Sequence, residues 1–154
     1  MGRMLVPLLI NRGFKLLLIG RNKEDLRRLF PSAKVSGYQN ADQIISSADV
    51  VVNLAVLNNN QNASINSMRD VNVHLAHRLA TISAKAGAAH FVNISSTHAI
   101  NPFPKSAYAI TKKEAIDKIN SIPGLTVTHL ILPSIYGNRF SGKLKLLNSC
   151  PTCI

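Results

Sequence analysis

Apolar runs alternate with amphipathic segments along most of the chain, which predicts strands alternating with helices. Short apolar runs predict buried strands at residues 14–19, 33–35, 49–54, 90–95 and 126–132. Capping residues and apolar positions three or four apart predict helices at residues 3–12, 23–30, 41–47, 64–86 and 105–120. This alternation is typical of an α/β fold, a doubly wound parallel sheet with helices on both faces.

The segment 64–86 has the longest helical pattern. Its apolar positions are three or four residues apart, at Ile65, Met68, Leu75, Leu79, Ile82 and Ala86. Asn72 stands where this stripe calls for an apolar side chain. A buried amide needs hydrogen-bond partners. Asn72 is therefore either a ligand-binding residue or a structural amide that bonds neighbouring backbone, and the sequence leaves both interpretations open.

The two ends of the pattern differ from those of a complete doubly wound sheet. The chain opens on a helix, in which Pro7 fits only near the first turn. Such a sheet normally opens on a strand, which lies centrally, between the strands predicted at 14–19 and 49–54. We therefore expect a partial domain over residues 1–137 that lacks its first strand. Residues 138–154 form a basic tail without a hydrophobic pattern.

Composition and charge narrow the class of protein. The 154 residues suffice for one domain, and 46% of them are hydrophobic, enough for a core. No apolar run reaches the length of a membrane span, and no small-residue cleavage site follows the apolar start, so we expect a cytoplasmic protein. The net charge is +11, but the cations are scattered and not interleaved with aromatics. We therefore favour anionic small molecules such as nucleotides over nucleic acid.

The two cysteines do not make a convincing site. Cys150 and Cys153 form one CxxC pair in the last five residues, and the chain has no second pair. A structural zinc ion needs four ligands. We therefore expect no metal site.

Tyr108 and Lys112 are the strongest chemical signal. Four residues apart on a predicted helix, they share one face. An ammonium beside a phenol lowers the phenol pKa and makes Tyr108 a usable acid or base. The preceding strand carries the hydroxyls of Ser95, Ser96 and Thr97 to the carboxyl edge of the sheet. Taken alone, the YxxxK spacing also fits a solvated helix face.

Five further segments accompany YxxxK in a fixed order. They lie at residues 2–6 (GRMLV), 49–55 (DVVVNLA), 71–73 (VNV), 91–97 (FVNISST) and 132–137 (LPSIYG). Together they resemble the NAD-dependent epimerase/dehydratase family, a branch of the extended short-chain dehydrogenases/reductases. The resemblance implies a Rossmann-like fold, NAD or NADP as cofactor, and hydride transfer at a hydroxyl or keto carbon of a nucleotide sugar. It also leaves open a homodimer formed through the helices 64–86 and 105–120.

The resemblance implies a role for each matching residue. Tyr108 would be the acid/base, and Lys112 its electrostatic partner and a ribose ligand. Thr97 would orient the substrate, with Ser96 as the alternate. The implied cofactor-binding residues are Gly2, Arg21, Asn22, Leu54, Ala55, Val56, Asn72, Lys112, Pro133 and Ser134.

Several positions depart from the family pattern. Only the last glycine of the phosphate-binding motif, Gly2, is present. Arg21 and Asn22 replace the acid that would bind a ribose 2′-hydroxyl, so Arg21 slightly favours NADP, unless it simply faces solvent. Leu132 replaces an arginine of the family, and the substrate domain is almost wholly absent. The chain is therefore either an enzyme unit or a catalytically inactive remnant that binds at most a nucleotide or a partner.

Overall fold

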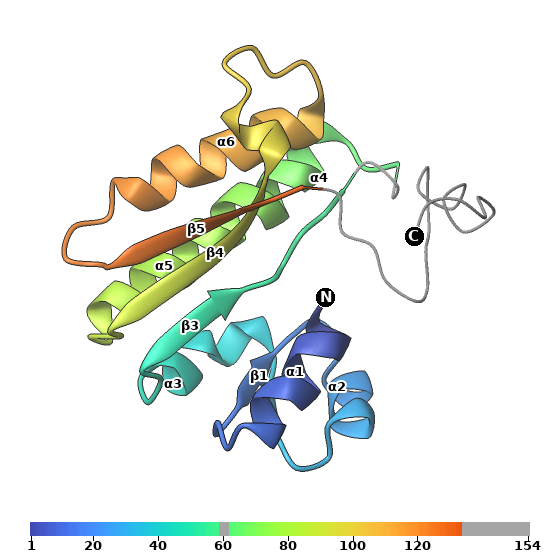
Figure 1. The fold of residues 1–154 in the computed structure, drawn as a ribbon, viewed down its shortest axis with the longest axis vertical. Helices are drawn as coiled ribbons and strands as arrows, with labels where there is room; N and C mark the ends of the chain where they lie inside the picture. Colours follow the sequence, from blue (N-terminus) through green and yellow to red (C-terminus); the bar gives the residue numbers. More distant parts are fainter. Residues whose placement is uncertain (59–61, 134–154) are drawn as a thin grey trace, which may run out of the picture.

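The computed structural model describes residues 1–58 and 62–133, which form parallel strands and covering helices (Figure 1). The helices are α1 (Gly2–Asn11), α2 (Lys23–Leu29), α3 (Ala41–Ile45), α4 (Ile65–Arg69), α5 (Ala76–Lys85) and α6 (Ala107–Asn120). The strands are β1 (Leu17–Ile19), β2 (Lys34–Ser36), β3 (Val50–Asn53), β4 (His90–Ser96) and β5 (Val127–Leu132). Short 3-10 turns, η1 (Tyr38–Asn40) and η4 (Thr97–Ile100), precede α3 and follow β4. The predicted α/β class is confirmed.

The strands form two sheets instead of one. β1 pairs with β2, and β3, β4 and β5 form a second sheet in that order, all of them parallel. Among the described residues β1 and β3 are not paired with each other. This break falls where the sequence pattern lacks a central strand.

The core joins the two sheets on one face. Seven buried residues form it: Ala41, Ile45, Ala76, Leu79, Ala80, Phe91 and Ile119. Ile19 of β1 and Val51 of β3 both pack against this cluster. Figure 1 shows α5 and α6 running along the β3–β4–β5 sheet. The two sheets are thus held together by side-chain packing and not by a shared strand ladder.

Two expectations about the first elements are wrong in detail. The strand predicted at 14–19 begins only at Leu17, and Phe14 is 59% exposed. Pro7 lies inside α1, beyond the first turn. Proline removes one helical hydrogen bond. The carbonyl that loses its donor is that of Arg3, which is exposed, so water can satisfy it.

The predicted helix 64–86 is present but not uniform. Ser64 caps it, its Oγ accepting from the Ser67 N–H at 3.2 Å. Between α4 and α5 the residues Asp70–Leu75 form a π-helical segment, η3. A π turn inserts one extra residue and shifts the face that follows. This shift falls at Asn72, where the apolar stripe skips a position.

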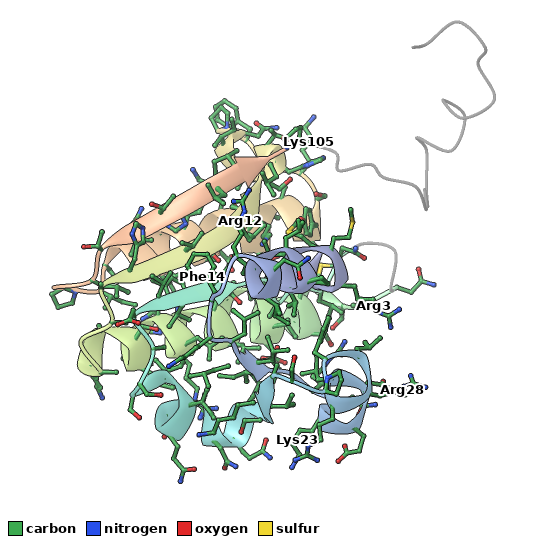
Figure 2. The ribbon with its side chains drawn as sticks, turned by 60° about the horizontal axis from the view of Figure 1, so that its bottom comes forward. Arg3, Arg12, Phe14, Lys23, Arg28 and Lys105 are labelled. Atoms are coloured by element: carbon green, nitrogen blue, oxygen red, sulfur yellow. The ribbon has the colours of Figure 1, made fainter. Side chains whose placement is uncertain are left out.

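The N-terminal elements carry many exposed cations. Figure 2 shows Arg3, Arg12, Lys23 and Arg28 around α1 and α2. Within α2 the Arg27–Glu24 and Arg28–Asp25 pairs are ion pairs at 3.1 and 3.0 Å. In the part of the chain that the structure describes, no helix is both long and apolar enough to cross a membrane.

Candidate functional site

The residues predicted to be catalytic come together where β4 ends and α6 begins. β4 ends at Ser96, and η4 follows it directly. α6 is capped by Ser106, whose Oγ accepts from the Ala109 N–H at 3.1 Å. This cap places Tyr108 in the first turn of α6, beside η4.

Tyr108 contacts Ser96 and His98. The Ser96 hydroxyl lies close enough to the Tyr108 phenol to lower its pKa. The rings of Tyr108 and His98 meet edge to face, with centroids 6.0 Å apart. Ser96 Oγ lies 3.0 Å from His98 Nδ1, and it accepts from the His98 N–H at 3.3 Å. Thr97, the residue that the family resemblance favoured, is exposed on η4. Ser96 is therefore the hydroxyl that the structure places against Tyr108.

The pKa of Tyr108 does not behave as the YxxxK spacing suggested. Burial raises it above its ordinary value of 10, and the nearby Ser96 hydroxyl only partly opposes this rise. The expectation of a lowered pKa is wrong for the protein without ligand. In a half-buried site the neutral phenol is favoured over the phenolate. Tyr108 is thus held in its proton-donating form.

Lys112 lies one turn further along α6 and is 4% exposed. Its Nζ donates to the Ile94 carbonyl at 2.7 Å, which ties α6 to β4. Burial lowers the pKa of Lys112 from 10.5 to about 8. An ammonium has three N–H donors, and the bond to Ile94 uses one of them.

Asn72 holds a loop in place. Its Oδ1 accepts from the Leu57 N–H at 2.8 Å, and its Nδ2 donates to the Leu57 carbonyl at 2.9 Å. The same Nδ2 lies 3.1 Å from Thr111 Oγ1 on α6. Of the two interpretations of Asn72, these bonds support the structural amide. Its contact with a nicotinamide ribose stays a prediction.

The start of α1 lies against the loop that follows β3. A Cβ built on Gly2 would be 3.7 Å from Leu54 Cδ1. No side chain caps α1, and its first turn has no acidic residue but carries Arg3. Free N–H groups at a helix start, without a nearby carboxylate, suit a phosphate.

Two further candidates follow β1. Arg21 is exposed, and its charge acts on the half-buried Tyr38. Asn22 is used as the cap of α2: its Oδ1 accepts from the Asp25 N–H at 3.1 Å, and its Nδ2 donates to the Asp25 carboxylate at 2.8 Å. Arg21 is therefore the residue at this loop that can pair an anion.

The other predicted residues are less constrained. Leu54 and Ala55 are half-buried, Val56 is 41% exposed, and Pro133 is exposed just after β5. Ser134, the tail 138–154 and the two cysteines lie outside the described residues. Within the described ranges, no three His, Cys, Asp or Glu side chains come together as a metal site.

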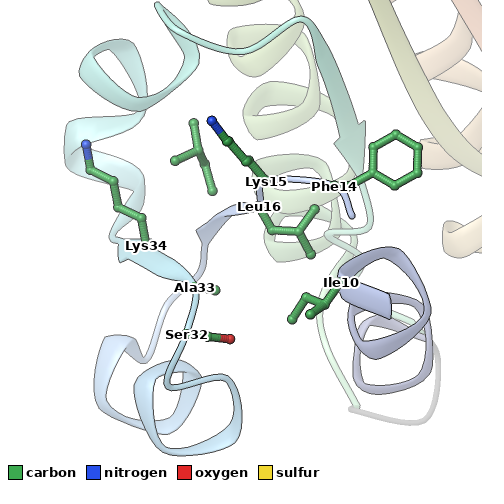
Figure 3. A pocket seen from close by; sticks show the side chains of 8 residues that line it. Ile10, Phe14, Lys15, Leu16, Ser32, Ala33 and Lys34 are labelled. Carbon is green, nitrogen blue, oxygen red and sulfur yellow. The ribbon is translucent and has the colours of Figure 1, made fainter. Parts of the chain in front are cut away.

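A surface pocket of about 390 Å³ lies away from these residues. Figure 3 shows it between the end of α1 and the beginnings of β1 and β2. Ile10, Phe14 and Leu16 line it, with Lys15 and Lys34 at its sides. It includes none of the predicted site residues.

Sequence reasoning missed a polar row beneath the site. Asn53, Asn93 and His129 are register partners on β3, β4 and β5, and their side chains are hydrogen-bonded across the sheet. The available signal was a polar residue inside each of three apolar runs. Their alignment depends on strand register, which the sequence alone does not provide.

A family model described as "NAD dependent epimerase/dehydratase family" matches residues 1–149. No curated protein matches the chain.

Solved structures share the fold at low sequence identity. The Bordetella bronchiseptica enzyme WbmH, in complex with NAD+, aligns with a TM-score of 0.76 and 20% identity over 96% of this chain and 57% of its own. UDP-glucuronic acid 4-epimerase from Bacillus cereus, in complex with NAD, aligns with a TM-score of 0.71 and 15% identity over 88% and 54%. WbmG of B. bronchiseptica, in complex with NAD and UDP, aligns with a TM-score of 0.70 and 17% identity over 84% and 48%. The chain thus spans about half the length of these structures.

Proposed function

The chain belongs to the NAD dependent epimerase/dehydratase family, and from this premise we propose that it is an NAD(P)-binding unit for reversible hydride transfer at a hydroxyl or keto carbon of a nucleotide sugar. The observation that carries the proposal is the grouping of Tyr108, Ser96 and Lys112 at the end of β4. The nucleotide sugar is suggested by UDP, UDP-glucose and UDP-glucuronic acid in the names of similar structures.

The acid/base step belongs to Tyr108 Oη. The raised pKa keeps this oxygen protonated near neutral pH, so it can donate its proton to a substrate oxygen and regain it in the reverse direction. Ser96 Oγ, next to the same phenol, would fix where that oxygen points. Lys112, whose pKa is about 8, is mostly an ammonium at pH 7. Its positive charge stabilises negative charge that develops on Tyr108 when the proton leaves.

The described residues fit a dinucleotide at several points. The uncapped start of α1, with Gly2 and Arg3, would face the phosphates. The loop 54–56 would line the adenosine side, and Lys112 would reach a ribose hydroxyl. When bound, the nicotinamide supplies the hydride acceptor or donor. We further propose that NADP is preferred over NAD, because the loop after β1 carries the cationic Arg21 and has no acidic residue.

Activity of the full chain on UDP-glucose, with NAD or NADP, tests the proposal. Tyr108→Phe should abolish both reduced nicotinamide and epimer formation, because the phenol proton is lost while the ring remains. Ser96→Ala and Thr97→Ala form a matched pair of neighbouring hydroxyl deletions. We expect about a hundredfold loss for Ser96→Ala and a much smaller loss for Thr97→Ala. A near-normal Tyr108→Phe enzyme would contradict the proposal, and a larger loss at Thr97 would reassign the orienting hydroxyl.

A further inference from the structure

A row of side-chain hydrogen bonds crosses the β3–β4–β5 sheet below the proposed site. Asn53 Nδ2 donates to Asn93 Oδ1 at 3.0 Å, and Asn93 Nδ2 lies 3.1 Å from His129 Nδ1. His129 Nε2 lies 2.9 Å from Asn120 Oδ1 at the end of α6. Asn53 and Asn93 are 4% and 2% exposed, so water does not readily replace these partners.

The row has one direction of donation. Because Asn120 Oδ1 can only accept, the proton of the neutral His129 ring sits on Nε2. His129 Nδ1 then accepts from Asn93 Nδ2, and Asn93 Oδ1 is left to accept from Asn53. The orientation of each amide therefore depends on its neighbour, back to the protonation state of His129.

The other end of the row is the backbone of the loop that follows β3. Asn53 Oδ1 accepts from the Ala55 N–H at 3.2 Å. Two residues further on, Asn72 holds both backbone groups of Leu57. The loop 54–57 is thus fixed at two points, by Asn53 and by Asn72. One of these points is connected through the sheet to His129.

We propose that Asn53, Asn93 and His129 are positioning residues for the loop 54–57, and that protonation of His129 releases this loop. A second proton on His129 turns Nδ1 into a donor that faces the donor Nδ2 of Asn93. Asn93 must then turn its amide over, which sets its Nδ2 against the Nδ2 of Asn53. Asn53 must turn in response, and the Ala55 N–H loses its acceptor.

The surroundings of His129 support neutrality at pH 7. Burial first, and then the charge of Lys112 on α6, lower the pKa of His129 below 6.5. On β4, His90 bonds Thr128 Oγ1 at 2.8 Å and is not part of the row. On η4, His98 faces Ser96. The remaining charged residues of α6 are Lys113, Glu114, which pairs with Arg69, and the exposed Asp117 and Lys118.

Amide and histidine-ring resonances of the full-length chain, followed by NMR from pH 8 to about pH 5, test the relay. In the wild type the Ala55 amide shift should move with the same midpoint as the His129 ring, below pH 6.5. In Asn93→Leu the ring should still titrate while Ala55 no longer follows it. His129→Gln should also remove the change at Ala55. His90→Gln, a histidine of the same sheet outside the row, should retain it.

An Ala55 amide that ignores His129 in the wild type would overturn the inference, whether or not the variants fold. So would an Ala55 amide that still titrates in Asn93→Leu. The consequence for cofactor affinity rests on the proposed function: NAD should bind several-fold more weakly below the His129 midpoint in the wild type, but not in His129→Gln. Failure of NAD to bind at any pH would contradict the proposed function, while the Ala55 titration would still decide the relay.

Discussion

Residues 1–40 form shorter and less buried elements than residues 41–133. In the first region β1 and β2 have three residues each, α2 buries none of its residues, and α1 buries only Val6. In the second region β4 has seven residues and β5 has six, and α6 buries five of its fourteen. All seven core residues lie in α3 or in later elements, from Ala41 onward. The core therefore belongs wholly to the second region.

Charge divides the two regions as well. Residues 1–40 contain eight Lys or Arg but only two Asp or Glu, and both acids are paired within α2. The proposed acid/base residues, Ser96, Tyr108 and Lys112, all lie in the second region. The residues proposed to hold phosphate, Gly2, Arg3 and Arg21, lie in the first. Under the proposed function, the well-packed region would position the chemistry, while the cationic, loosely packed region would set nucleotide affinity.

The largest expected effect is a difference in stability loss between alanine substitutions of two buried phenylalanines. Phe91 on β4 is 0% exposed within the core, and Phe30 at the end of α2 is 8% exposed. We expect Phe91→Ala to lower the free energy of unfolding by about 3–5 kcal/mol. Phe30→Ala should cost only about 1–2 kcal/mol, because less structure depends on it. Denaturant unfolding followed by circular dichroism measures both. Equal losses would show that the two regions are one cooperative unit and would break the comparison.

The second effect concerns the stability cost of burying Lys112. Burial lowers the pKa of Lys112 to about 8, so below that pH the folded state carries a disfavoured cation. Replacement by the apolar Met should therefore raise the free energy of unfolding at pH 7 by about 2 kcal/mol, after allowing for the lost bond to Ile94.

The pH dependence of the free energy of unfolding tests the same pKa shift in a second way. Between pH 8 and about 10 the unfolded state binds the Lys112 proton more tightly than the folded state, so wild-type stability contributed by this group rises with pH. The Lys112→Met protein should lack that rise. Urea unfolding at pH 7 and pH 9 supplies the measurement. A variant less stable than the wild type at pH 7 would contradict the account.

The smallest effect is acid sensitivity confined to the second region. The pKa of folded His129 is lowered, so the unfolded state takes up the proton first. The stability that neutral His129 provides is complete above about pH 6.5 and is lost as the pH falls toward the folded pKa. Residues 1–40 contain no histidine. On acidification the amide protection factors, corrected for the intrinsic exchange rate at each pH, should fall in β5 before they fall in β1. The opposite order would count against the comparison.

The sequence was most informative where local pattern decides structure. The order of elements and the Tyr108–Lys112 spacing on α6 both followed from local residues. The strand predicted at 14–19 was too long, because an apolar run does not show that Phe14 stays mostly exposed.

The less predictable features depend on contacts distant in sequence. The choice of Ser96 over Thr97 depends on which side chain faces α6 at the end of β4, and residue type does not reveal this. The alignment of Asn53, Asn93 and His129 requires the register of three strands. The direction of the Tyr108 pKa shift depends on burial in the folded protein, which outweighs the effect of the nearby Ser96 hydroxyl.

The most direct test of the division between affinity and chemistry is calorimetric titration of NADP and of NAD into the wild type, Arg21→Ala and Tyr108→Phe. The account predicts that the wild type binds NADP more tightly than NAD, and that Arg21→Ala removes this preference, a change of about 1.4 kcal/mol for each tenfold in affinity. Tyr108→Phe should leave both affinities nearly unchanged. Tighter binding of NAD that ignores Arg21, or loss of binding in Tyr108→Phe, would contradict the account.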